Sequence, residues 1–226
     1  MKIYVVSCSP PRVERLLKAA APLNLDFEVV ASPLGADEEV QRRGKTCLER
    51  GTGYATGIAA TIGHIRAMER IAQRDDPFAI IIEDDVRFHV MFNEYLKFAE
   101  SYMVKSEVDI LSIGFVNFPT IKNGIRAGDL LVQENVILGN PWGAQGYIIT
   151  KQYANYFSKL FSIDDLSLPY SGQFVTDCVM FDPILNCKRS TVSHPFIVEC
   201  PEEQTIAGNN NKPNLFQTIR REWFYM

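Results

Sequence analysis

The stretch Phe78-Ala79-Ile80-Ile81-Ile82-Glu83-Asp84-Asp85 joins five apolar residues directly to three carboxylates. Three of the apolar residues are β-branched isoleucines, and an unbroken run of this kind predicts a strand that is buried on both faces. Ligands of open α/β sheets bind at the carboxyl ends of strands, and oxygen ligands suit magnesium, manganese and calcium. A solvated acidic turn is the alternative, and it fits one carboxylate better than three. The stretch therefore predicts a ligand or cation site at a sheet edge.

Composition indicates an ordinary soluble globular protein. The 226 residues are 46% hydrophobic, which is enough for a continuous core in one large domain or two small ones. The net charge is -4 and the basic residues are scattered, so nucleic acid is not an expected partner. The five cysteines are odd in number and form no CxxC pair, which favours neither a disulfide framework nor a structural zinc site.

The chain shows no pattern of a secreted or membrane-spanning protein. Its N-terminal apolar stretch is too short for a signal peptide, and no run approaches the roughly 20 apolar residues of a membrane span. We therefore expect a cytoplasmic protein. The C-terminal segment 215–224 carries apolar residues interleaved with two arginines. It is expected to dock on the domain, with peripheral contact to a membrane as the alternative.

Outward from the acidic stretch, apolar runs alternate with helical periodicities. The runs predict strands at Ile3–Val6, Phe27–Ala31 and Asp109–Gly114. Apolar spacing of three and four predicts helices after Pro10, over 57–74 and over 92–103. This alternation indicates an α/β fold with a parallel sheet and right-handed crossovers. The stretch 32–53 is polar and contains glycine, and it is expected to form a long loop with at most one helical turn.

The second half of the chain is less regular. Further strands are predicted at Leu130–Leu138 and Tyr147–Thr150, with Thr150 capping the helix that follows. A short helix is expected over 174–180 and a strand, interrupted by Pro195, over 191–198. The asparagine-rich segment 207–213 is expected to be a mobile loop. No linker divides the chain.

Four blocks, in this order along residues 3 to about 160, resemble glycosyltransferase family 25, the lipopolysaccharide and collagen sugar transferases. They are VSCSPPRVER, GIAATIGHIRAMERI, IIEDDV and WGAQGYIITKQYANYF. The sequence departs from the family pattern at three positions, because Gly63 replaces the usual Ser, and Ala144 and Gln145 replace Thr and His.

The resemblance implies a GT-A fold in which residues 1–226 form a single domain. Its residues 1–115 would be the nucleotide-binding half and 116–226 the acceptor-side half. It also implies a nucleotide-sugar donor, UDP-linked by expectation, and a glycan or glycoconjugate acceptor. The implied chemistry is inversion at the anomeric carbon, with a divalent metal at the acidic motif, Mn²⁺ first and Mg²⁺ as the alternative.

Within that motif, alternation along an extended strand end points Glu83 and Asp85 the same way and Asp84 the other. We expect Asp85 to be the main metal ligand and Glu83 to contact the ribose or a metal-bound water. Asp84 is either a ligand or a buried anchor. His194 is a candidate to complete the metal shell, and a surface histidine is an equal alternative.

Nucleotide contacts are expected from the end of the first strand and the helix after it. Arg12 and Arg15 would lie near the nucleotide or its pyrophosphate, and Ser7 and Cys8 would line the base pocket. Solvated salt bridges are the alternative for both arginines. His64 is more often a structural residue in such a helix, and only the resemblance gives it a nucleotide-sugar role.

Sugar contacts are expected from Trp142 and Gln145, since an aromatic face stacks on a sugar ring and an amide bonds hydroxyl groups. The alternative is that both are ordinary core residues.

Inverting transfer needs a carboxylate that takes the proton of the acceptor hydroxyl. The candidates are Asp164, Asp165, Asp177 and Asp182. Asp177 is favoured because its mostly apolar surroundings would raise its affinity for a proton. Asp164 is second, on the resemblance of its SIDDL segment to the family.

Three other functions fit parts of the pattern. A phosphoacceptor receiver domain also carries a strand that ends in Glu-Asp-Asp, but it needs a later strand ending in Asp, where this chain has Ile113-Gly114. A magnesium-dependent nucleotidyltransferase normally has a glycine-rich loop after its first strand, and SCSPPR has no glycine. A sugar-binding module without catalytic activity is the third.

Overall fold

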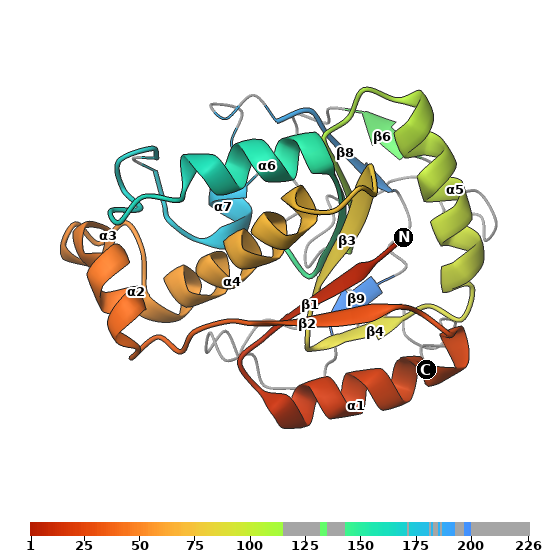
Figure 1. Cartoon of the computed structure of the whole chain (residues 1–226), viewed down its shortest axis with the longest axis horizontal. Coiled ribbons are helices and arrows are strands. Elements are labelled where there is room, and N and C mark those ends of the chain that lie inside the picture. Colours follow the sequence, from red (N-terminus) through yellow and green to blue (C-terminus); the bar gives the residue numbers. More distant parts are fainter. Residues whose placement is uncertain are drawn as a thin grey trace, which may run out of the picture.

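The computed structural model describes residues 1–114, 143–170, 172–180, 182, 185, 187–192 and 197, and the backbone of 132–134, 198 and 199. Within these residues, helices cover both faces of a β-sheet (Figure 1). In chain order the elements are β1 (Ile3–Ser7), α1 (Pro10–Ala20), the 3₁₀ helix η1 (Ala21–Leu23), β2 (Phe27–Ala31), α2 (Glu38–Arg43), α3 (Lys45–Glu49), α4 (Ala55–Ala72), β3 (Phe78–Glu83), β4 (Val86–Phe88), α5 (Phe92–Lys105), β5 (Ile110–Gly114), β6 (Val132–Glu134), β7 (Gly146–Thr150), α6 (Lys151–Leu160), α7 (Thr176–Met180), β8 (Arg189–Val192) and β9 (Ile197–Glu199).

The sheet combines parallel and antiparallel strands in the order β2-β1-β3-β7-β5-β8-β6. β1 is parallel to β2 and β3, and β5 is parallel to β8, but β7 is antiparallel to both β3 and β5. The expected α/β class is confirmed, and the mostly parallel sheet is corrected to a mixed one. β7 comes from the expected acceptor-side half and lies between two strands of the nucleotide-binding half. The two halves therefore share one sheet.

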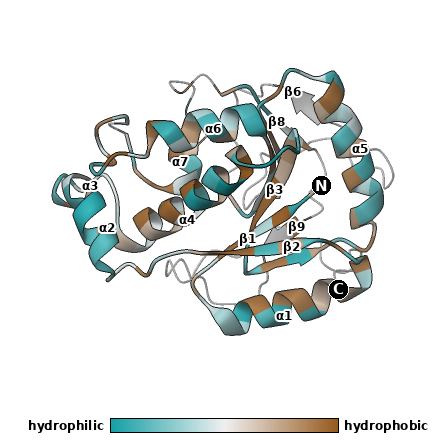
Figure 2. Cartoon of the chain, in the orientation of Figure 1, coloured by the Kyte–Doolittle hydropathy of each residue, from teal (hydrophilic) through white to brown (hydrophobic). Residues whose placement is uncertain are grey.

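Helices on both faces explain why the central strands are apolar without interruption. α4 and α6 pack on one face, and α1 and α5 on the other (Figure 1). Side chains of β3 alternate between the two faces, so Ile81 packs with α4 and α6, whereas Ile80 and Ile82 pack with α1 and α5. Figure 2 shows α1 and α5 with both hydrophobic and hydrophilic segments, as expected of helices that have one exposed side.

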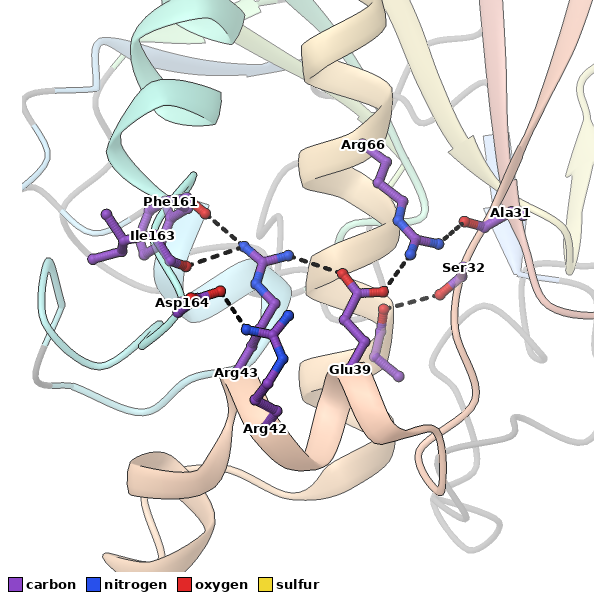
Figure 3. Close-up of polar contacts among 10 residues, drawn as sticks. Ala31, Ser32, Glu39, Arg42, Arg43, Arg66, Phe161, Ile163 and Asp164 are labelled. Atoms are coloured by element: carbon purple, nitrogen blue, oxygen red, sulfur yellow. Dashed lines mark hydrogen bonds and ion pairs between the residues drawn. The ribbon is translucent and has the colours of Figure 1, made fainter.

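The stretch 32–53, expected to be a long loop with at most one helical turn, contains two short helices, α2 and α3, and is thus more helical than expected. Contacts with distant segments hold α2 in place (Figure 3). The Arg43 guanidinium donates to the carbonyl of Phe161 at 2.7 Å and pairs with Glu39 at 3.1 Å. Glu39 also pairs with Arg66 of α4. These partners are far away in the sequence, which is why local pattern did not predict the helix.

Other elements follow the sequence closely. The hydroxyl of Thr150 accepts a hydrogen bond from the Tyr153 N–H at 3.1 Å, which confirms the predicted cap of α6. β4 was not expected, and the strand expected over 191–198 includes β8 and β9, with 193–196 outside the described residues. Segments 207–213 and 215–224 also lie outside them. No helix in the described part of the chain is both long and apolar enough to cross a membrane.

Gly63 lets α4 pack closely against β1 and the segment after β2. A Cβ atom at position 63 would lie 2.6 Å from Cγ1 of Val6 and 2.8 Å from Oγ of Ser32. The Ser32 hydroxyl donates to the carbonyl of Ala59 at 2.9 Å. Ser32 thus lies where the side chain of a serine at position 63 would be.

The substitution Gly63→Ser is expected to lower the free energy of unfolding by about 1–3 kcal/mol, because it overpacks this contact. Urea denaturation measures the loss, and the double variant Gly63→Ser/Ser32→Gly is expected to recover part of it. If the losses of the two single variants add in the double variant, the close contact is not their cause.

Candidate functional site

Two neighbouring strands bring the first polar residues of the site together. β1 and β3 are parallel and Val6 pairs with Glu83, so Ser7 and Asp84 leave the sheet at the same edge. The Ser7 hydroxyl donates a hydrogen bond to Oδ2 of Asp84 and accepts one from the N–H of Ser9 at 2.9 Å. The acidic triplet therefore lies at the carboxyl end of a central strand, as the sequence predicts.

Arg12, in the first turns of α1, lies between two of the three carboxylates. Its Nη1 is 3.2 Å from Oδ1 of Asp84 and 3.7 Å from Oδ2 of Asp85. Each of the three side chains is 10% exposed or less, so water screens their charges weakly. The two carboxylates thus converge on one guanidinium group.

A turn at Asp84 and Asp85 ends the alternation of the strand. Because of this turn, the expectation that Glu83 and Asp85 point the same way is wrong. Asp85 shares Arg12 with Asp84, whereas Glu83 faces His64 on the α4 side of the sheet. Asp84, bonded to Ser7 and Arg12, has the contacts expected of a buried anchor.

His64 and Tyr147 meet Glu83 on the α4 face. Nδ1 of His64 is 2.7 Å from the Tyr147 hydroxyl oxygen, and Nε2 is 3.5 Å from Oε1 of Glu83. The two rings stack with centroids 5.7 Å apart. Tyr147 pairs across the sheet with Ile81, two residues before Glu83, so both side chains face α4. α4, β3 and β7 thus contribute one residue each to a row of polar side chains, His64, Glu83 and Tyr147, which we call the polar chain.

Burial controls the protonation of His64 and Tyr147. His64 has no exposed surface, and burial lowers its pKa to about 3, although the charge of Asp177 acts in the opposite direction. Burial also raises the pKa of Tyr147 well above its usual value. Both side chains are therefore neutral at neutral pH.

The pKa of Glu83 is raised above its ordinary value. Burial is the largest cause, followed by the negative charges of Asp84 and Asp177, while Arg12 acts in the opposite direction. The Glu83 side chain nevertheless remains 30% exposed. A carboxyl group at the border of core and solvent, with a raised pKa, is typical of functional sites.

Asp177, the favoured catalytic base, lies close enough to this group for its charge to act on it. Its carboxylate raises the pKa of Glu83 and of Tyr54, in each case after burial. α7 packs against α4, where the hydroxyl groups of Thr176 and Thr61 are 3.2 Å apart. The structure thus brings Asp177 near the acidic strand end.

Asp164, the second candidate base, is part of a different cluster. Its side chain is 86% exposed and pairs with Arg42 of α2 (Figure 3). No hydrogen bond or ion pair among the described residues joins it to Glu83, so Asp177 remains the first candidate. Asp165 and Asp182 accept hydrogen bonds from hydroxyl groups of neighbouring segments, at 2.8 Å and 2.9 Å.

The backbone of Gln145 contacts the acidic end of β3. Its carbonyl accepts a hydrogen bond from the N–H of Glu83 at 3.1 Å. Its buried side-chain Oε1 takes no hydrogen bond from any described residue. Trp142 and His194, expected to contact the sugar and the metal, lie outside the described residues.

Cys8 and Arg15 flank the Arg12 cluster. Cys8 is partly buried directly after β1, and burial, followed by the charge of Asp84, raises the pKa of its thiol. Arg15 is exposed on α1, unlike Arg12. Arg12 contacts the acidic motif from a buried position on the same helix.

Sequence reasoning missed Tyr147. In the run Gly146–Thr150 this residue reads as one more apolar strand position, and only the pairing of β7 with β3 places it against His64. One signal was present, because a buried tyrosine hydroxyl usually requires a hydrogen-bond partner.

The donor set can be tested for its fit to a divalent cation. No group of three His, Cys, Asp or Glu side chains within the described ranges could hold a metal ion, so Asp84 and Asp85 form a pair. Magnesium is commonly bound through one or two carboxylates, with substrate phosphates and water completing its shell. Asp84 and Asp85 match this number of carboxylate ligands, and Arg12 is a cationic group that would compete with the ion for them.

The solved structures that are similar to this chain include the following three. A glycosyltransferase involved in the glycosylation of the major capsid of PBCV-1 is 8% identical, with a TM-score of 0.49 over 90% of this chain and 93% of that one. S. aureus TarS 1-349 in complex with UDP-GlcNAc is 14% identical, with a TM-score of 0.42 over 87% of this chain and 57% of that one. HddC from Yersinia pseudotuberculosis is 10% identical, with a TM-score of 0.40 over 88% and 92%. Comparison with curated proteins finds no match.

Comparison with protein families gives a direct assignment. The model of glycosyltransferase family 25 (LPS biosynthesis protein) matches residues 55–170. This match covers half of the chain and includes α4, the acidic end of β3, β7 and α6. His64, Glu83 and Tyr147 all lie within the matched region. Because the family model matches half of the chain, the protein belongs to glycosyltransferase family 25.

Proposed function

We propose that the protein transfers a hexose from a nucleotide sugar, UDP-linked by expectation, to a hydroxyl group of a glycan or glycoconjugate, with inversion at the anomeric carbon. The observation that supports this most is the edge of the sheet where Arg12, Asp84 and Asp85 meet, in a chain of a glycosyltransferase family. The family's description as an LPS biosynthesis protein favours a glycan acceptor.

Arg12 is the proposed contact for the diphosphate of the donor. A guanidinium group binds phosphate oxygens through paired hydrogen bonds, and Arg12 lies at the carboxyl end of β1, where ligands of α/β sheets bind. Its present partners, Asp84 and Asp85, hold it there. Ser7 and Cys8 are the proposed neighbours of the base, and Trp142 and Gln145 the proposed neighbours of the sugar.

Asp84 and Asp85 are the residues that would hold a divalent cation, Mn²⁺ by expectation or Mg²⁺, with His194 as a further candidate ligand. The cation would supply positive charge next to the diphosphate as it leaves. The place of the two carboxylates at the carboxyl end of β3, next to the proposed diphosphate contact Arg12, supports this assignment.

Asp177 is the proposed catalytic base. An inverting transfer needs one ionised carboxylate to accept the proton of the attacking hydroxyl group. The charge of Asp177 raises the pKa of Glu83, after burial and the charge of Asp84, so Asp177 lies close enough to act at this site. Glu83 then contacts the donor or a hydroxyl group of the substrate.

Binding of nucleotides tests this function before any acceptor is known. Thermal unfolding is followed with UDP, GDP, CMP and dTDP and with their sugar conjugates, each with Mn²⁺. At least one nucleotide is expected to raise the melting temperature in proportion to the logarithm of its concentration. The variant Asp85→Asn is expected to lose this effect and the matched variant Asp164→Asn to keep it. If no nucleotide stabilises the wild-type protein, the proposed function is overturned.

A further inference from the structure

We propose that His64 and Tyr147 are positioning residues, which hold the Glu83 carboxyl group in one orientation for the transfer reaction. This inference rests on the proposed function, because it assigns roles at the same site. It differs from the nucleotide-sugar contact expected for His64, since a residue with no exposed surface acts on the substrate only through another residue.

A histidine at position 64 lowers the stability of the folded protein relative to an apolar residue there. It is fully buried among apolar residues of α4 and the sheet. Only one of its two ring nitrogens is in a hydrogen bond, because Nε2 has no hydrogen-bond partner among the described residues. An unsatisfied buried polar atom destabilises the folded state, whereas leucine or methionine would carry no such penalty. The nitrogen that lacks a partner is the one that faces Glu83.

Tyr147 fixes the direction in which His64 can act. Its hydroxyl group is buried and keeps its proton, so it can donate to Nδ1 of His64 across 2.7 Å. The imidazole is neutral and has one N–H group, and with Tyr147 as the donor this N–H group is on Nε2. It then faces Oε1 of Glu83 at 3.5 Å. When Glu83 is ionised, the opposite tautomer would turn a nitrogen lone pair towards a carboxylate oxygen, which is repulsive.

The 3.5 Å contact is longer than a hydrogen bond, as is often found in active sites that hold no substrate. Among the described residues, Glu83 is otherwise held through its backbone, whose N–H bonds to the carbonyl of Gln145. Its side chain is 30% exposed and would sample several rotamers without a partner. His64, itself held by stacking and by a hydrogen bond to Tyr147, limits that freedom.

Two substitutions of His64 separate positioning from packing. In His64→Gln the side-chain amide reaches the place of Nε2 and can still donate to Glu83. In His64→Asn the amide reaches only the place of Nδ1 and keeps the contact with Tyr147. We expect kcat to fall about threefold in the Gln variant and about thirtyfold in the Asn variant, with KM for the donor changed by less than about threefold in both. Equal losses, or losses that follow the melting temperatures, would overturn the proposal.

A second pair of variants removes one buried hydroxyl group each. Tyr147→Phe is expected to lower kcat about tenfold, because the tautomer of His64 is no longer fixed. Tyr153→Phe is the matched control, since its hydroxyl group bonds to the carbonyl of Met180, away from Glu83. Equal kcat values for the two variants would contradict a role for Tyr147.

The tautomer can be read without turnover. The chain has three histidines, so ¹⁵N spectra of histidine-labelled protein are simple, and His64→Gln assigns the signal. We expect the Nε2–H tautomer of His64 in the wild type and a mixture in Tyr147→Phe. An Nδ1–H tautomer in the wild type would overturn the positioning role. If the wild type turns over no donor but shows the expected tautomers, the proposed function fails and the arrangement of the three residues stands.

Discussion

Replacing Asp177 by asparagine is expected to lower kcat for sugar transfer by about 10²–10⁴-fold, the usual contribution of a general base. Donor binding is expected to change by less than about threefold, because the proposed role of Asp177 is to accept the acceptor's proton and not to hold the nucleotide. Single-turnover transfer and equilibrium binding of the nucleotide, measured on the same preparation, separate the two effects.

Asp164→Asn is the matched control for this substitution. Asp164 is exposed and pairs with Arg42 at the surface, so its loss should change kcat little. The pKa of Glu83 gives a second readout, since the charge of Asp177 raises it, and ¹³C spectra should show a lower pKa for Glu83 in Asp177→Asn. Transfer that survives in Asp177→Asn and is lost in Asp164→Asn would reverse the assignment of the base.

Replacing Arg12 by alanine is expected to have opposite effects on cation and nucleotide. Asp84 and Asp85 lose the positive group that lies 3.2 Å and 3.7 Å from their oxygens. Mn²⁺ should then bind about tenfold more tightly or better in the absence of nucleotide, because a competing positive charge is gone. With Mn²⁺ saturating, nucleotide diphosphate should bind at least about tenfold more weakly, because a phosphate contact is gone.

Calorimetric titration measures both affinities, and Arg12→Lys is the matched variant that keeps the charge. The alanine variant should also melt at a lower temperature without a cation, because two buried carboxylates lose a cationic partner. Mn²⁺ should then raise its melting temperature more than it raises that of the wild type. Unchanged Mn²⁺ affinity would show that Arg12 and the cation do not share these carboxylates.

The parts of the fold that the sequence predicted are those with a local signal. The apolar run before Glu83 required a strand with both faces covered, and α4 and α5 followed from their apolar spacing. The direction of β7 has no such signal, because an antiparallel strand buried on both faces reads like a parallel one. α2 was missed for a related reason, since its stabilising partners Phe161 and Arg66 are distant in sequence.

The site was predicted to a similar extent. The pattern of charges placed Glu83, Asp84 and Asp85 at a sheet edge, and the first strand placed Ser7 and Arg12 beside them. The separate roles of the three carboxylates could not be predicted. The prediction of their orientation assumed strand alternation, and the turn at Asp84 and Asp85 ends that alternation. Membership of family 25 favours glycosyl transfer over the receiver and nucleotidyltransferase alternatives. A sugar-binding module without activity is distinguished only by turnover.

Release of nucleotide from sugar donors tests the central claim most directly. The wild type and Asp177→Asn are incubated with a panel of UDP, GDP, CMP and dTDP sugars, with glycan acceptors, in Mn²⁺ or in chelator, and free nucleotide is quantified. We predict that the wild type releases nucleotide from at least one donor in Mn²⁺, that chelator suppresses the release, and that Asp177→Asn is slower by about 10²-fold or more. Absence of release from every donor and acceptor pair, by wild-type protein that is folded, would contradict a transferase.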